Sequence, residues 1–317
     1  MSDHLVKLLA ERGVASRRAS ERMIREGQVS IDGHVVREPG TLVDPHEARV
    51  LVDGKPLPPK PNPIYRVLNK PKGTITSRND PHDRKTVFDL LDDPPTSLGA
   101  VGRLDFQTEG VLLLTNDGEL AYRLTHPSYG VTKTYLVKVS GTPEPRKIVQ
   151  LQRGIKLDDG PTRPATVDLV ESAGPSSWLL IQIQEGRNRI VRRMIEHVGH
   201  KVLKLKRIGF GGITLRNLEP GHSRALTAGE LGRLRRIVRT PGKAKLEMTF
   251  DLRRAVAEAL RQPLPKREES APSKLDENGQ PYRKKGWARP KAKKTGKPRS
   301  RVGSRGRNGG GGPKKRR

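Results

Sequence analysis

One aspartate lies in a loop whose residue types could support catalysis. Asp105 belongs to the stretch Gly102-Arg103-Leu104-Asp105-Phe106-Gln107-Thr108-Glu109-Gly110, which runs directly into the apolar residues 111–114. Loops fixed by a buried strand commonly carry reactive groups, and the neighbouring Arg103 would help to keep the carboxylate ionised. By composition alone, Asp105 would be an ordinary turn residue, so the hypothesis depends on what else the sequence places near it.

A strongly basic segment of the central region has a helical period. Its apolar residues follow the spacing i, i+3, i+4, i+7 at Val191, Met194, Ile195 and Val198. Arg192 borders this stripe, whereas Arg193 points nearly the opposite way. Arg192 is therefore the better candidate for a half-buried ion pair with Asp105, because a planar guanidinium can hold a carboxylate through two hydrogen bonds. The other arginines of the segment, Arg187, Arg189 and Arg193, are expected to meet phosphates or solvent.

The charge balance predicts a polyanionic partner. The 317 residues include 63 Lys and Arg against 34 Asp and Glu, a net charge of +29. Residues 279–317 contain sixteen Lys or Arg and no acidic residue, interleaved with Gly and Pro. A basic excess of this size is typical of proteins that bind nucleic acid, and such a segment buries too little apolar surface to order itself.

Cysteine content and hydropathy indicate the compartment. The chain has no cysteine, which excludes disulfides and thiolate zinc sites and fits a reducing compartment. Its longest apolar run, residues 111–114, is far shorter than the roughly 20 residues of a membrane span. The N-terminus lacks a basic start followed by an apolar stretch, so no secretory signal is expected. We predict a cytoplasmic protein that does not contact membranes.

The sequence divides into a small module, a larger domain and a tail. Residues 1–55 combine two short helices, the second capped by Ser16, with a hairpin around Asp32-Gly33, and residues 56–63 contain five prolines in eight positions. Short strand patterns with interrupting helices over residues 64–240 favour an α+β fold with a mostly antiparallel sheet. Residues 241–261 are a candidate helical extension, and residues 262–317 are expected to be disordered.

Four segments resemble a known enzyme family. The string from Gly102 to Leu120 is similar to the signature of pseudouridine synthases, in the branch that acts on ribosomal RNA of the small and large subunits. Residues 69–73 resemble the first motif of that family, residues 133–137 its tyrosine-bearing strand, and residues 185–194 the segment with its basic residue. Residues 4–50 resemble the S4-type RNA-binding module that family members often carry. Ile190 departs from the pattern, since Gln or Glu is expected there.

The resemblance implies roles for individual residues. Asp105 would act as nucleophile or as base on an intermediate, Arg192 would be the basic residue, and Tyr135 would stack on the target base. Without the resemblance, Tyr135 would be a core residue on the strand face of Val137 and Val139. The reaction only rearranges atoms, so no metal or other cofactor is implied. RNA contacts are expected from a set of basic residues: Arg17, Arg18, Arg22, Arg25, Arg103, Lys133, Arg187, Arg189 and Arg193.

We therefore predict a pseudouridine synthase, acting as a monomer on ribosomal RNA or on ribosomal precursor particles. Residues 185–194 and the long basic extension look more like members that act on the large subunit. The alternatives are a synthase for small-subunit ribosomal RNA or for transfer RNA, and a non-catalytic RNA-binding assembly factor. The combination of Asp105, Tyr135 and Arg192 argues against the non-catalytic alternative.

Overall fold

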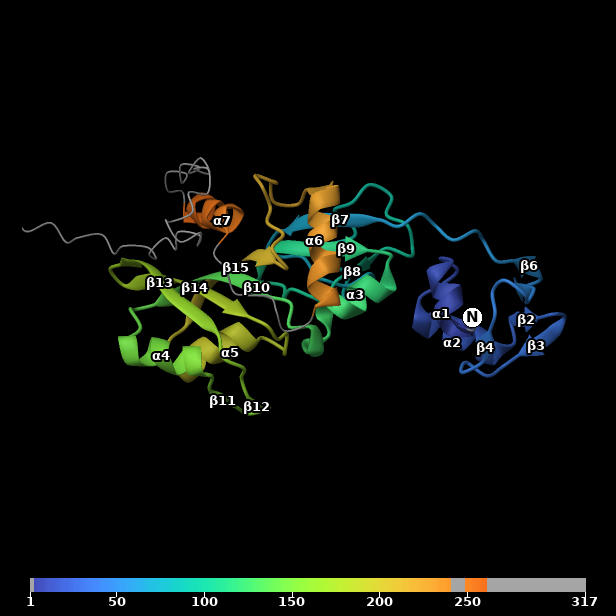
Figure 1. Ribbon diagram of the computed structural model, residues 1–317, viewed down its shortest axis with the longest axis horizontal. Coiled ribbons are helices and arrows are strands. Elements are labelled where there is room, and N and C mark those ends of the chain that lie inside the picture. The colour runs from blue at the N-terminus through green and yellow to red at the C-terminus, as the bar shows by residue number, and fades with distance from the viewer. Residues whose placement is uncertain (1–2, 241–248, 261–317) are drawn as a thin grey trace, which may run out of the picture. The chain divides into compact units, whose positions relative to one another are not determined.

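The computed structural model describes residues 3–240 and 249–260 (Figure 1). The predicted basic tail, residues 262–317, and the first part of the predicted extension lie outside the described residues. The N-terminal module pairs two helices with a small antiparallel sheet of order β3-β2-β5-β6, and its core includes Leu5, Leu9 and Ile24. The Ser16 hydroxyl accepts a hydrogen bond from the Ala19 amide and caps α2, as predicted. The elements of the module are β1 (Asp3–His4), α1 (Leu5–Glu11), α2 (Arg17–Glu26), β2 (Val29–Ile31), β3 (His34–Val36), β4 (Leu42–Val43), β5 (Val50–Val52) and β6 (Lys55–Pro56).

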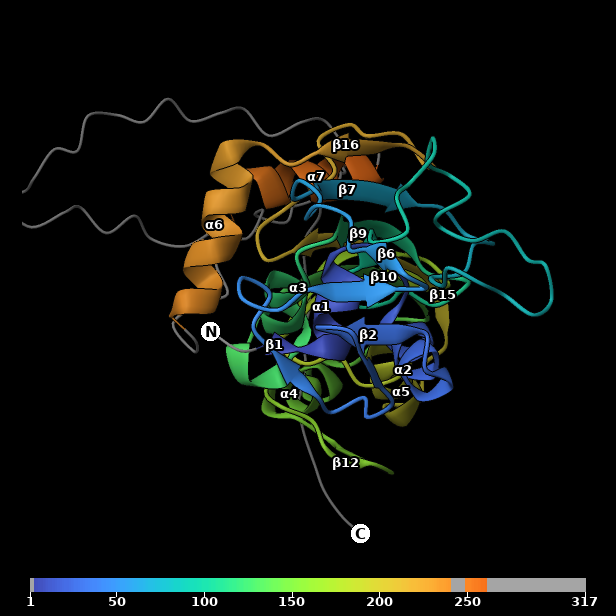
Figure 2. The same cartoon turned by 90° about the vertical axis from the view of Figure 1, so that its right-hand side faces the viewer.

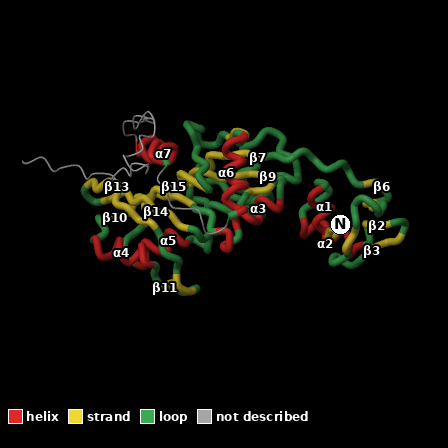
Figure 3. The backbone as a smooth tube through the Cα atoms, in the orientation of Figure 1, coloured by secondary structure: helices red, strands yellow, loops and turns green. Residues whose placement is uncertain are grey.

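The larger domain is built on one mixed sheet of order β13-β14-β10-β15-β9-β7-β16, with β8 paired to β9. All neighbouring strands are antiparallel except β15 and β9, which confirms the predicted α+β fold with a mostly antiparallel sheet. Residues 57–64 connect the module to this sheet without helix or strand (Figure 3). The strands are β7 (Tyr65–Lys70), β8 (Gly99–Ala100), β9 (Glu109–Thr115), β10 (Lys133–Ser140), β13 (Thr166–Ala173), β14 (Ser176–Ile183), β15 (Val202–Phe210) and β16 (Ser223–Ala225).

Helices cover both faces of this sheet. Buried residues of α4 (Pro145–Arg153) and α5 (Ile190–His197) pack on the face that carries Tyr135, whereas α7 (Phe250–Leu260) packs on the opposite face against Leu136 and Ile208 (Figure 1). At the other end, α3 (Gly118–Thr125) and α6 (Ala228–Arg239) share a core with β7 and β9 (Figure 2). The remaining elements are the 3₁₀ turn Pro127–Tyr129 and the hairpin of β11 (Lys156–Leu157) and β12 (Gly160–Pro161). No helix of the described residues is long and apolar enough to cross a membrane.

Several peripheral elements of the larger domain have weak sequence patterns. Strand β13 is an edge strand that carries Asp168 and Glu171, so its hydrophobic alternation is weak. Helix α4 begins at Pro145 and has only Leu151 buried, which gives a thin apolar stripe. Helix α7 lies inside the range 241–261 where one more helix was expected.

The parallel pairing of β15 with β9 requires a glycine at residue 110. Gly110 has a φ of +110°, and a Cβ built there would lie 2.1 Å from the carbonyl oxygen of Arg207. The two backbones therefore meet at the point where the Asp105 loop enters β9, opposite Arg207 in the register. Only a residue without a side chain allows this approach.

We expect Gly110→Ala to lower the free energy of unfolding by about 3 kcal/mol or more, because it adds both backbone strain and a clash with a carbonyl group. Gly118→Ala is the matched control, since that glycine lies at the start of α3 with open space around it. Urea denaturation measures both variants. Equal stability of the two would show that the close approach of β15 to β9 is not a constraint.

Candidate active site

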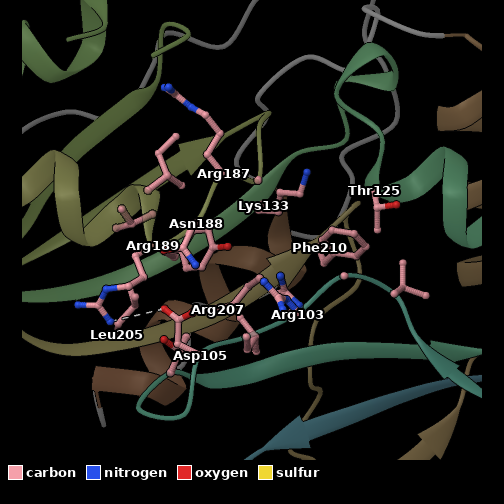
Figure 4. A pocket seen from close by; sticks show the side chains of 18 residues that line it. Arg103, Asp105, Thr125, Lys133, Arg187, Asn188, Arg189, Leu205, Arg207 and Phe210 are labelled. Carbon is pink, nitrogen blue, oxygen red and sulfur yellow. Dashed lines mark ion pairs between the residues drawn. The ribbon is translucent and has the colours of Figure 1, made fainter. Parts of the chain in front are cut away.

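A cavity of about 240 Å³ opens beside the junction of β9 and β15 (Figure 4). Its walls come from four parts of the chain that are distant in sequence. The Asp105 loop forms one side, the loop before α5 forms another, and strands β10 and β15 form the floor. Its lining includes two predicted catalytic residues and several basic ones: Asp105, Tyr135, Arg103, Lys133, Arg187, Arg189 and Arg207.

The Asp105 loop is held from behind by the end of β7 and the turn that follows it. The fully buried Lys70 donates hydrogen bonds to the carbonyl oxygens of Thr108 and Pro71, both at 3.0 Å. The Thr76 hydroxyl donates to the Leu104 carbonyl at 2.9 Å. These bonds fix the backbone on both sides of Asp105, whose side chain remains 37% exposed toward the cavity. Burial lowers the pKa of Lys70 to about 8, although the carboxylates of Asp105 and Glu109 oppose that shift.

Arg189 is the arginine within ion-pair distance of Asp105. Its Nη1 lies 4.0 Å from Oδ2 of Asp105 (Figure 4). The predicted ion pair with Arg192 is absent from the described residues, and the Nε of Arg192 is buried without a hydrogen-bond partner among them. The helical phase was correct for the apolar stripe, whose four residues are buried, but Arg192 and Arg193 are both half-buried. Arg189 could not be placed by that phase because it precedes the helix, as the N-cap with a left-handed φ of +47°.

Arg192 still lies close enough to Asp105 for their charges to interact. Burial and the positive charge of Arg189 lower the pKa of the Arg192 guanidinium, and Asp105 opposes this shift. Asp105 therefore interacts electrostatically with two arginines, Arg189 just before α5 and Arg192 on its first turn. This arrangement keeps positive charge beside Asp105, although among the described arginines only Arg189 approaches it within 4.0 Å.

Two other arginines of this segment bind carboxylates of the protein, contrary to the expectation that they meet phosphates or solvent. Arg187 contacts Asp159 at 2.8 Å and Glu185 at 2.9 Å. Arg193 donates from Nη1 to the other carboxylate oxygen of Asp159 at 2.9 Å. Asp159 lies in the β11–β12 hairpin, so Arg187 ties that hairpin to the loop before α5 and Arg193 ties it to α5 itself. They position the loop that carries Arg189.

Cross-strand pairs between β10 and β15 form the floor. Tyr135 is opposite Arg207, and Lys133 is opposite Phe210, with Ile208 as the extra residue of a β-bulge between the pairs. Directly opposite residues share one face of a sheet, and the bulge turns Phe210 to the same face as Arg207. All four side chains are at most 9% exposed, and all line the cavity.

The floor carries buried positive charge. Burial, reinforced by the positive charge of the nearby Arg207, lowers the pKa of Lys133 to about 8, although Glu185 opposes the shift. Glu185 itself already binds the Arg163 amide at 2.7 Å and Arg187 at 2.9 Å. The cavity therefore suits a polar or anionic ligand. Lys70 and Arg207 are not among the predicted site residues, although in both places the sequence has a basic residue next to apolar positions of a strand.

Comparisons with known proteins identify the family. Residues 64–197 match the family model described as RNA pseudouridylate synthase. A ribosomal large subunit pseudouridine synthase B of Bacillus subtilis is 43% identical over 235 residues, which cover 74% of this chain and 96% of the relative. The chain belongs to the RNA pseudouridine synthase family. An uncharacterized RNA pseudouridine synthase of Aquifex aeolicus is 44% identical, with 74% of this chain and 94% of the relative covered. A crystal structure of a pseudouridylate synthase, 31% identical, superposes with a TM-score of 0.54 over 73% of this chain and 98% of that chain.

A pseudouridine synthase is an isomerase, and this one carries an RNA-binding module as predicted. Residues 5–49 match the S4 domain. The four arginines selected on α2 are all exposed, so their guanidinium groups are available to a partner: Arg17, Arg18, Arg22 and Arg25. Arg22 also lies 4.0 Å from Glu26 on the same helix. Such an exposed pair contributes little to stability.

Lys133 should link the stability of this synthase to pH. Its pKa is about 8 in the folded chain and near the ordinary 10.5 when unfolded. Between these values the unfolded chain binds more protons, so the contribution of Lys133 to stability rises with pH across that window. We expect Lys133→Met to be more stable than wild type at pH 7, by up to about 3 kcal/mol, and to lose this advantage toward pH 10.

Lys138→Met is the control for that measurement, because Lys138 lies on the same strand but is half-buried beside Trp178. Guanidinium denaturation at a series of pH values provides the comparison. A difference in the free energy of unfolding between Lys133→Met and wild type that stays constant from pH 7 to pH 10 would contradict the claim that burial lowers the pKa of Lys133.

Proposed function

We propose that this synthase converts one uridine of large-subunit ribosomal RNA into pseudouridine. The observation that carries the proposal is the single carboxylate of Asp105, which enters a cation-lined cavity from a loop fixed by Lys70. The names of relatives add support for the substrate, since those of Bacillus subtilis, Yersinia pestis and Shigella flexneri are all called ribosomal large subunit pseudouridine synthase B. The site and the S4 domain together fit an RNA substrate.

The reaction needs one carboxylate and conserves every atom. The bond between N1 of uracil and C1′ of ribose breaks, the base turns, and C5 bonds to C1′. C5 then loses its proton, and N1 ends with one. Asp105 acts as nucleophile or as base on the intermediate, whereas hydrolysis of a glycosidic bond commonly uses two carboxylates. Arg189 and Arg192 place positive charge beside this carboxylate.

The uridine must leave its stack to reach Asp105. Enzymes that act on a base extrude the nucleotide into a pocket and hold the base by stacking and hydrogen bonds. Tyr135 provides an aromatic face at the floor of the cavity. Base stacking on an aromatic side chain contributes about 1–3 kcal/mol. We place Tyr135 under the extruded uracil and Asp105 beside its ribose.

Asp105→Asn should abolish pseudouridine formation, because an amide is neither a nucleophile nor a base. RNA affinity should stay the same or rise slightly, since one negative charge is removed near phosphates. Tritium release from RNA labelled at C5 of uridine measures turnover, and filter binding measures affinity. Turnover by Asp105→Asn near the wild-type rate would remove Asp105 from the mechanism.

The exposed arginines of α2 should contribute to RNA binding and not to the chemical step. We expect the double variant Arg18→Ala/Arg22→Ala to bind RNA more weakly, with a salt slope reduced by about 0.7–0.9 for each lost phosphate contact. Turnover at saturating RNA should not change. Arg84→Ala is the control, because Asp80 accepts two hydrogen bonds from that exposed guanidinium, at 2.8 and 2.9 Å. An unchanged salt slope in the double variant would exclude α2 from the RNA interface.

The choice of substrate can be tested with purified components. The full-length chain is incubated with transcripts of large-subunit and small-subunit ribosomal RNA, with precursor particles of both subunits, and with transfer RNA. Pseudouridine at one position of the large-subunit RNA is the expected result. Modification confined to small-subunit RNA or to transfer RNA would overturn the substrate assignment while leaving the reaction intact.

A further inference from the structure

Arg207 is a buried cation with unused hydrogen-bonding capacity. It is 3% exposed, and its Nε donates to the carbonyl oxygen of Val111 at 2.7 Å. Its guanidinium carbon lies 5.0 Å from the ring centroid of Phe210. These contacts fix the plane of the group. Its Nη2 is buried and has no hydrogen-bond partner among the described residues.

Nearby carboxylates do not supply the missing acceptor. Asp105 faces Arg189, and both carboxylate oxygens of Glu185 are used by Arg163 and Arg187. A second cation, Lys133, lines the same floor. Leaving a buried donor without a partner costs free energy, and a functional site is where such a cost is expected. The Nη2 of Arg207 is therefore available to an acceptor on a ligand in the cavity.

The position of Arg207 selects the group that it meets. It lies on the floor strand β15, directly opposite Tyr135, on which the proposed function places the uracil ring. The phosphates of an extruded nucleotide stay with the RNA backbone toward the mouth, whereas the base enters deepest. The groups of uracil that accept hydrogen bonds are its two carbonyl oxygens.

We propose that Arg207 is a catalytic residue that donates a hydrogen bond to a carbonyl oxygen of the reacting uracil. When the bond between N1 and C1′ breaks, its electron pair stays with the base, and the negative charge spreads onto the carbonyl oxygens. A fixed donor aimed at developing charge in a cavity shielded from water accelerates such a step. As C5 bonds to C1′, the electron pair of the base forms the new bond and its negative charge is neutralised. The proton that then leaves C5 is balanced by the one that N1 gains. This inference rests on the proposed function.

The first test separates chemistry from binding. Arg207→Met should lower the single-turnover rate at saturating RNA by about 10²–10³-fold, the cost of losing one such donor, with RNA affinity nearly unchanged. Lys206→Met is the control, because Lys206 is a half-buried cation one residue away on the opposite face of β15. It should retain the wild-type rate. Weaker binding with an unchanged saturating rate would assign Arg207 to a phosphate and overturn the proposal.

The second test remains decisive even if Arg207→Met is less stable toward unfolding than wild type. Wild type and variant are compared on RNA whose target uridine carries sulfur in place of oxygen at C2 or at C4. Sulfur accepts hydrogen bonds poorly. The ratio of the wild-type to the Arg207→Met single-turnover rate should therefore be smaller on one of the two thio substrates than on the oxygen substrate, as in a double-mutant cycle. An equal effect on the oxygen and both sulfur substrates would contradict the contact.

The inference and the proposed function fail in different ways. If wild type forms no pseudouridine in any RNA, the proposed function is wrong. If wild type is active and Arg207→Met matches its rate, only the role of Arg207 is wrong.

Discussion

Buried positive charge around one carboxylate loop is the constraint on which this site depends. Lys70, Lys133 and Arg207 are each at most 6% exposed, and burying cations costs free energy. Lys70 and Arg207 offset part of that cost by donating to backbone carbonyls of the Asp105 loop and of β9. The same bonds hold that loop in place. The free-energy cost of burial that these bonds do not offset is typical of a functional site, where residues serve activity at the expense of stability.

This constraint explains the architecture around the cavity. The parallel pairing of β9 with β15 brings the Asp105 loop beside Arg207, and Gly110 allows the two backbones to approach. The bulge at Ile208 turns Phe210 to the cavity face of β15. Arg187 and Arg193 bind Asp159 and fix the loop that carries Arg189. Together these features surround a space the size of a small ligand with charged side chains.

The sequence located the residues that carry strong local signals. Ser16 caps its helix, as predicted, and Asp105 and Tyr135 line one cavity, whereas their catalytic roles stay a prediction. The helical phase predicted a half-buried Arg192. It could not show that Arg189 precedes the helix in a left-handed conformation. Arg207 was missed because its burial depends on a pairing with β9 nearly a hundred residues away. The β-bulge at Ile208 also could not be predicted, because a bulge produces no periodic pattern in the sequence.

The most direct test of the account is a map of pseudouridines in all ribosomal RNA from cells that lack this gene. The gene is then restored as wild type or as Asp105→Asn. We expect one pseudouridine of large-subunit RNA to disappear, to return with wild type and to stay absent with Asp105→Asn. An unchanged map in the deletion strain, or full restoration by Asp105→Asn, would contradict the claim that this carboxylate isomerises a ribosomal uridine.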